Sequence, residues 1–124
     1  MTLERQQLGI IGEELAAREL IARGYVILER RYRTECGEID IVAQDGDTLV
    51  FVEVRARATD EFGTAAESVT RAKQRRLARL AIDYLARRQV ADRPCRFDVV
   101  AIDAALSEAP QITVYPAAFE AAAR

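Results

Sequence analysis

The sequence predicts an α/β fold, in which two long helices alternate with a group of strands. Residues 3–23 and 65–89 lack proline, are rich in Ala, Leu, Glu and Arg, and carry apolar residues three or four positions apart. Residues 25–32, 38–57 and 96–103 are shorter runs of β-branched and aromatic residues, separated by Gly or Pro. Read along the chain, these segments give the order α-β-β-β-α-β.

All 124 residues are expected to form one domain, with a core over about residues 3–115 and a C-terminal tail at 116–124. No repeat, linker or low-complexity segment indicates a second domain. Half of the residues are hydrophobic, which is enough to build a core without disulfides or a structural metal.

The first helix is expected over residues 3–23, and Gly24 ends it in the position that glycine favours after a helix. On a helical wheel Glu13 lies on one face with small and apolar residues, namely Gly9, Ala16, Ala17 and Leu20. Gly9 and Ala16 are expected to let this face approach a sheet closely. Glu13 is therefore a candidate site residue, and a plain ion pair with an arginine is the simpler alternative.

A strand over residues 25–32 is followed by Gly37 and then by a predicted β-hairpin at residues 38–57. The dipeptide Asp45-Gly46 is expected to form its two-residue turn, since glycine accepts the positive φ that such turns need.

The hairpin carries two carboxylates inside almost wholly apolar strands, Asp40 and Glu53. A buried charge costs free energy unless it is bound, and two neighbouring carboxylates repel each other. With the expected turn, Asp40 lies opposite Phe51, Glu38 lies opposite Glu53, and Asp40 and Glu53 are diagonal neighbours within reach of one ion. Glu38 is interpreted as a spare ligand or an edge residue, outside the core set.

The same strand alternation places Glu53, Arg55 and Arg57 on one face, with Val50, Val52 and Val54 on the other. A same-strand charged pair at an exposed sheet edge is the alternative for Glu53 and Arg55. The apolar runs on both sides favour a central strand instead.

After a polar loop at residues 58–64, the second helix is expected over 65–89, with an apolar stripe of Leu77, Leu80, Ala81, Tyr84 and Leu85. The segment 96–103 is expected to be a strand, and residues 111–115 a last, short edge strand.

Residue types exclude several function classes. The chain has no histidine and two cysteines, so a zinc site is nearly excluded, and catalysis by a histidine base or a Ser-His-Asp triad is excluded. It shows no apolar signal peptide and no uncharged apolar run of membrane-spanning length. Cytoplasmic residence without membrane association is the expectation.

The net charge of −2 hides an uneven distribution. Residues 65–90 carry a surplus of five positive charges, and residues 97–124 a surplus of three negative ones. The basic helix could offer a face to a polyanion, and a solvated helix in an arginine-rich chain explains it equally well.

Three acids from two elements thus become candidates for a shared cation: Glu13, Asp40 and Glu53, with Arg55 beside them. Carboxylate oxygens suit Mg²⁺ and Mn²⁺, and such an ion activates water and neutralises charge on a phosphate.

These motifs resemble the PD-(D/E)xK nuclease superfamily, whose core is α-β-β-β-α-β. They are still more similar to the YraN-like family of short bacterial proteins, which are similar to archaeal Holliday-junction resolvases. The matching segments lie in order between about residues 8 and 102: Gly9-Ile-Ile-Gly-Glu-Glu-Leu-Ala16, Gly24-Tyr25, Gly37-Glu-Ile-Asp-Ile41, Phe51-Val-Glu-Val-Arg-Ala-Arg57, Lys73-Gln-Arg-Arg-Leu77 and Arg96-Phe-Asp-Val-Val100.

The resemblance implies a restriction-endonuclease-like fold with a mixed central sheet flanked by helices. It implies that Asp40 and Glu53 bind metal, that Glu13 binds metal or orients water, and that Arg55 takes the place where lysine is typical. Arginine does not deprotonate in proteins, so Arg55 is expected to contact phosphate rather than to act as a base. Lys73 could supply a displaced ammonium, and a solvent-facing lysine is the favoured alternative.

The leading expectation is a Mg²⁺- or Mn²⁺-dependent endonuclease that acts on structured or branched DNA, with a homodimer suited to paired cuts. The residues expected to hold the nucleic-acid backbone are Arg57, Arg71, Lys73, Arg75, Arg76 and Arg79. The alternatives are a nucleic-acid-binding module of this fold with little or no cleavage, which Arg55 favours, and a small scaffold or assembly partner.

Overall fold

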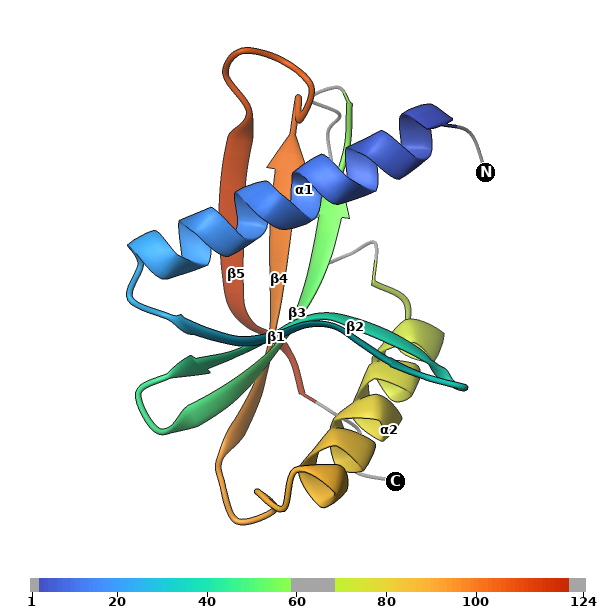
Figure 1. Ribbon diagram of the computed structural model, residues 1–124, viewed down its shortest axis with the longest axis vertical. Coiled ribbons are helices and arrows are strands. Elements are labelled where there is room, and N and C mark those ends of the chain that lie inside the picture. Colours follow the sequence, from blue (N-terminus) through green and yellow to red (C-terminus); the bar gives the residue numbers. More distant parts are fainter. Residues whose placement is uncertain (1–2, 59–68, 121–124) are drawn as a thin grey trace.

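The computed structural model describes residues 3–58 and 69–120, which form a five-stranded mixed sheet with one helix on each face (Figure 1). The elements in chain order are α1 (Leu3–Ala22), β1 (Val26–Thr34), β2 (Gly37–Asp45), β3 (Thr48–Ala56), α2 (Arg71–Arg87), β4 (Cys95–Asp103) and β5 (Gln111–Phe119). This order confirms the predicted α/β fold, and it is consistent with a restriction-endonuclease-like core.

The strands follow one another across the sheet in the order β1-β2-β3-β4-β5. Neighbours are antiparallel except β3 and β4, which run parallel because the chain returns through α2 between them. Strand β3 is therefore the central strand. Its place confirms that Glu53 and Arg55 lie inside the sheet rather than on an exposed edge strand.

Alternating residues of the central strands pack into two hydrophobic clusters, one on each face of the sheet. Val50 and Val52 face α1, where Ala16, Ala17 and Leu20 are fully buried. Leu49 and Phe51 lie in the other cluster, with the predicted stripe of α2 (Leu77, Leu80, Ala81, Tyr84 and, partly buried, Leu85). Because the side chains of a strand alternate between faces, this division confirms the predicted orientation of β3.

The close approach of α1 to the sheet occurs at Gly12, and the prediction that Gly9 permits it was wrong. A Cβ atom added at Gly12 would lie 2.6 Å from the Cβ of Ala56 on β3, whereas one added at Gly9 would meet nothing within 4 Å. This contact sets α1 against β3 and fixes the position of Glu13, the next residue along the helix. In Figure 1, α1 crosses the sheet diagonally.

Helix α2 begins later than predicted. Thr70 caps it, since its hydroxyl accepts a hydrogen bond from the Lys73 amide at 3.2 Å. Val69 and Thr70 are thus not helical, contrary to the prediction of a helix from residue 65. Residues 59–68, which include most of the predicted loop at 58–64, lie outside the described part.

The two-residue turn of the β2–β3 hairpin is Gly46-Asp47, one residue later than predicted, and Asp45 pairs with Thr48. Each residue of β2 is therefore paired with a residue of β3 two positions later than predicted. Gly46 has φ +60°, which suits the first position of a two-residue turn. The expected pairs Asp40–Phe51 and Glu38–Glu53 were therefore wrong. Phe51 pairs with Val42 instead.

Strand β5 is an edge strand, as predicted, but it continues to Phe119 instead of ending at residue 115. Four residues assigned to the tail, 116–119, thus belong to the sheet. Among the described residues, no helix is both long and apolar enough to cross a membrane.

Candidate metal and nucleic-acid site

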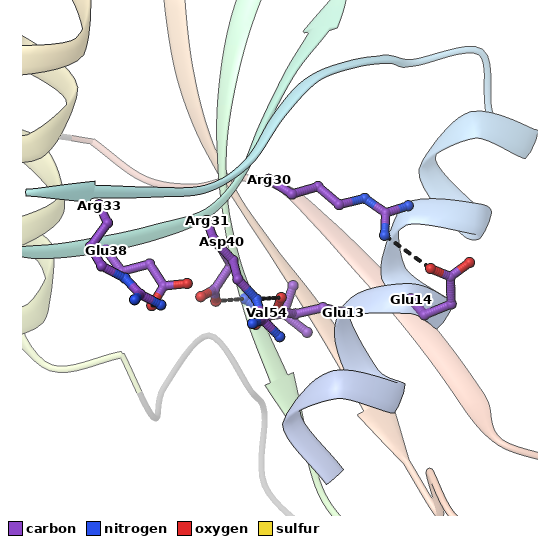
Figure 2. Close-up of polar contacts among 8 residues, drawn as sticks. All are labelled: Glu13, Glu14, Arg30, Arg31, Arg33, Glu38, Asp40 and Val54. Carbon is purple, nitrogen blue, oxygen red and sulfur yellow. Dashed lines mark hydrogen bonds and ion pairs between the residues drawn. The ribbon is translucent and has the colours of Figure 1, made fainter. Parts of the chain in front are cut away.

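The candidate site begins where β2 separates from β3. At this end the β2–β3 ladder stops at the pair Ile41–Val52, and continuing that register by one residue puts Asp40 directly opposite Glu53. Beyond this point an Asp40 side-chain oxygen, Oδ2, accepts a hydrogen bond of 2.8 Å from the backbone N–H of Val54 (Figure 2). The carboxylate thus takes the place of a strand partner and lies in the gap between the two strands.

Asp40 and Glu53 are neighbouring acids, and the pKa of each is raised. Burial, and then the charge of Glu53, raise the pKa of Asp40 to about 8. Burial also raises the pKa of Glu53, against the opposing charges of Arg55, Lys73 and Arg76 and a hydrogen bond with Asp40. A cation bound at this pair would lower both pKa values, because it would stabilise the ionised carboxylates.

On its other side Asp40 joins two further acids. One carboxylate oxygen from each of Glu13, Glu38 and Asp40 lies within 4.8 Å of the other two, and all three residues are half-buried. Three convergent carboxylates are the oxygen donor set that Mg²⁺ and Mn²⁺ accept, so these residues fit a divalent cation. We call Glu13, Glu38 and Asp40 the acidic triad.

The structure groups the carboxylates differently from the predicted ligand set of Glu13, Asp40 and Glu53. Glu13 and Asp40 come together as predicted. Glu53 contacts Asp40 but is not a member of the triad, and Glu38, which the sequence left outside the core set, takes that place. The spacing of Glu38 and Asp40, two positions apart on one strand, was a usable signal, but the incorrect hairpin register directed Glu38 toward Glu53.

Two adjoining hollows open on either side of Glu13. The larger, about 540 Å³, is lined by Asp40, Arg55 and Arg57 among others. The smaller, about 460 Å³, is lined by Arg31, Arg33 and Glu38 among others. Glu13 lines both hollows, so the acidic triad lies where they meet. Arginines line each hollow near the triad.

The cation beside Glu53 on the central strand is Arg55, whose Nη1 lies 3.9 Å from Glu53 Oε2. That distance is long for an ion pair, and the side chain stays about one-third exposed, so its donors remain available to a phosphate. Arg57, two residues along, is already held by Asp103, with Nε 2.7 Å from Oδ1. Its predicted contact with nucleic acid would compete with that bond.

The basic residues predicted on the second helix divide into two groups. Lys73 and Arg76 are half-buried and lie close enough to Glu53 for their charges to lower its pKa, whereas Arg71, Arg75 and Arg79 are exposed. Lys73 is thus closer to the site than a solvent-facing lysine, the interpretation that the sequence favoured, would be. The Nε of Arg76 is buried, and no hydrogen-bond partner lies near it in the described part of the chain.

Comparisons with known proteins give a family but no activity. The profile of uncharacterised protein family UPF0102 matches residues 12–102. A UPF0102 protein of Moorella thermoacetica is 55% identical over 102 residues, which cover 82% of this chain and 85% of the relative. A UPF0102 protein of Ralstonia pickettii is 57% identical over 81% of this chain and 83% of the relative. A UPF0102 protein of Geobacter metallireducens is 44% identical over 98% of this chain and 99% of the relative.

Proposed function

The chain belongs to the UPF0102 family, and we propose that it is a Mg²⁺- or Mn²⁺-dependent endonuclease that hydrolyses phosphodiester bonds in structured or branched DNA. The proposal includes kinship with the YraN-like proteins and the PD-(D/E)xK superfamily, on the ordered motifs of the sequence. The αβββαβ order of the elements supports it.

The observation that carries the proposal is the state of Asp40. A half-buried carboxyl group inside the sheet, with a pKa of about 8 and three other acids around it, does not favour a stable core. The same Asp40 carboxyl group suits a site that binds a divalent cation. Arginines border the same place, as binding of a phosphate diester requires.

Each side chain has a role in this proposal. The acidic triad and Glu53 would hold the cation, which when bound activates water and neutralises charge on the phosphate. Arg55 would hold the scissile phosphate and stabilise the negative charge that develops on it, because guanidinium keeps its protons and does not act as a base. The exposed arginines of α2 would hold the backbone without reading sequence. A two-fold homodimer would suit paired cuts in a branched substrate.

A second function, a nucleic-acid-binding module with little or no cleavage, is favoured by one feature. Arg55 occupies the place where the resembling nucleases carry lysine, so a proton-accepting amine is missing from that strand position. A scaffold role is the third alternative.

The test compares cleavage of branched and linear DNA by the wild type and by Asp40→Asn, in Mn²⁺ and in EDTA. Asp92→Asn is a matched control, because Asp92 is exposed and precedes β4, at the end of that strand opposite the site. We expect metal-dependent cleavage that falls about 100-fold or more in Asp40→Asn and is unchanged in Asp92→Asn.

Cleavage in EDTA, or equal cleavage by Asp40→Asn, would reject the proposal. Binding to DNA without cleavage would select the binding module. If the wild type binds neither DNA nor RNA at low salt, the scaffold role is favoured.

A further inference from the structure

Two arginines of the edge strand β1 are bound to the acidic triad. Arg31 Nε lies 2.8 Å from Glu13 Oε1, and Arg33 Nη2 lies 3.5 Å from Glu38 Oε2 (Figure 2). The pKa of Arg31 is raised by its hydrogen bond to Glu13 and also by the charges of Glu38 and Asp40. Arg31 is thus bound to one carboxylate of the triad, Glu13.

The backbone at Arg31 has an unusual conformation. In the β1–β2 register Arg30 pairs with Ile41 and Tyr32 with Ile39, so Arg31 lies across from Asp40. Arg31 has φ +55°, a left-handed conformation that is unfavourable for a long side chain. Such strain persists where the surrounding contacts enforce it, and it is found disproportionately at functional sites.

The neighbouring ion pair provides an internal comparison. Arg30 Nη1 lies 2.9 Å from Glu14 Oε1, again between β1 and α1, and Figure 2 shows the two pairs side by side. Arg30 is not among the described residues that have a positive φ, and Glu14 is not in the triad. Of these two neighbouring arginines, only Arg31 combines a positive φ with a contact to the triad.

A guanidinium and a divalent cation compete for the same carboxylate oxygens. If Glu13 and Glu38 bind a metal ion, Arg31 and Arg33 lose their partners but keep their charges. Both arginines line the smaller hollow, of about 460 Å³, which adjoins the hollow that contains Asp40 and Arg55. Two guanidinium groups with free donors at that place match the oxygens of a phosphate.

We propose that Arg31 and Arg33 form a phosphate-binding subsite for the nucleic-acid backbone, closed by Glu13 and Glu38 in the metal-free protein and opened when a divalent cation binds these carboxylates. The inference rests on the proposed function, since it assigns metal to the acidic triad and nucleic acid to the adjoining surface. It adds that the two bindings are coupled through a change of partners at Arg31. Such coupling is reciprocal, so each ligand tightens the other.

The first test measures Mn²⁺ binding by calorimetry in the wild type, Arg31→Gln and Arg30→Gln, without DNA. Both side chains are about 45% exposed, so neither substitution is expected to unfold the protein, and thermal melting checks this. Arg31→Gln removes the competing cation, and we expect about two- to tenfold tighter Mn²⁺ binding. Arg30→Gln should stay within about twofold of the wild type.

The second test measures the affinity for a branched DNA by fluorescence anisotropy, in EDTA and in Ca²⁺, a hard cation that also binds carboxylate oxygens. The ratio of the two dissociation constants is the coupling, expected to be about five- to fiftyfold in the wild type. Arg31→Gln should lower that ratio at least about threefold and Arg33→Gln by less, while Arg30→Gln preserves it.

The outcomes separate the two proposals. If the wild type binds Mn²⁺ and DNA but Arg31→Gln and Arg30→Gln behave alike in both tests, the subsite is overturned and the proposed function stands. If Arg31→Gln binds Mn²⁺ more weakly than the wild type, Arg31 supports the triad rather than competing for it, and the inference is also wrong. A wild type that binds no Mn²⁺ rejects the proposed metal site and, with it, the subsite.

Discussion

Asp40 on β2 and Asp98 on β4 lie in the same sheet, on either side of the central strand β3, and the groups around them differ sharply. Asp98 on β4 is almost fully buried, and both of its oxygens are bound. Arg96 Nε (2.9 Å) and the Ala117 N–H (2.9 Å) reach one, and Tyr25 Oη (2.9 Å) and Arg96 Nη2 (3.1 Å) reach the other. Asp40 on β2 has one backbone donor, Val54, and is otherwise surrounded by Glu53, Glu13 and Glu38.

The difference distinguishes a structural carboxylate from a candidate functional one. Asp98 on β4 connects Tyr25, the residue before β1, with Ala117 on β5, and its hydrogen bonds replace the water lost on burial. Asp40 is half-buried with one backbone donor and with acids as its other neighbours, and burial and the charge of Glu53 raise its pKa. Burial alone therefore does not show whether an acidic residue is structural or functional. The groups that contact its carboxylate do.

The largest expected effect is on stability at Asp98. Asp98→Ala leaves the Arg96 guanidinium and the Tyr25 hydroxyl without their acceptor, so we expect a loss of about 2–4 kcal/mol of unfolding free energy in urea denaturation. Asp92→Ala, at an exposed position, should change it by less than about 0.5 kcal/mol. Equal stability of the two variants would remove the distinction between Asp98 and an ordinary surface acid.

An intermediate effect is expected at the contact that brings Glu13 to Asp40. Gly12→Ala places a methyl group 2.6 Å from the Ala56 Cβ of the central strand, and we expect a loss of about 1–3 kcal/mol, because neither backbone can move aside freely. Gly9→Ala, with open space around it, should gain up to about 1 kcal/mol from helix propensity. Urea denaturation of both variants measures this, and a tolerated Gly12→Ala would show that α1 can shift away from β3.

The smallest effect is the pH dependence of the folding stability that arises from Asp40, and its direction is clearly defined. The folded-state pKa, about 8, lies above the ordinary value of 3.8, so the folded protein holds this proton more tightly than the unfolded chain. Stability from the protonated group is present below about pH 4 and is lost as pH rises toward 8. In Asp40→Asn this loss is absent, because the amide stays neutral and its oxygen can still accept from Val54.

We therefore expect Asp40→Asn to be the more stable protein at pH 8 in EDTA, by about 1–2 kcal/mol, and the difference to shrink toward pH 5. Melting curves at both pH values measure it. Saturating Mn²⁺ should reverse the order at pH 8, since a bound cation stabilises only the carboxylate. A mutant that is less stable than the wild type at pH 8 in EDTA would show that Asp40 is compensated, as Asp98 is.

Much of the fold was predictable because its signals are local. The two helices, the strand at residues 96–103 and the central place of the strand with Glu53 and Arg55 follow from periodicity and from apolar runs of a few residues. The start of α2 was missed because Thr70 was not recognised as the N-cap, although it precedes the first helical residue in the usual way. The turn was misplaced because Asp45-Gly46 and Gly46-Asp47 are both acceptable two-residue turns, and only packing of the strands selects between them.

The acids of the candidate site were predictable only in part, for the same reason. Glu13 and Asp40 were recognised from their residue type and setting, but Glu38 was placed against the wrong neighbour by a register error of two residues. Nothing local in the sequence pairs Arg31 with Glu13, since that contact depends on a strained residue in β1 and on the position of a helix 18 residues earlier.

By itself, the amino-acid order determined which segments are helical or extended and which strands are buried, because those preferences arise between residues close together in the chain. It also set an inventory rich in arginine and carboxylate and empty of histidine. Only the tertiary structure decided which carboxylates converge and which arginines reach them, because that depends on the strand register and on the contact between Gly12 and Ala56. Both are fixed by packing between residues far apart in sequence, at a precision of a few ångströms.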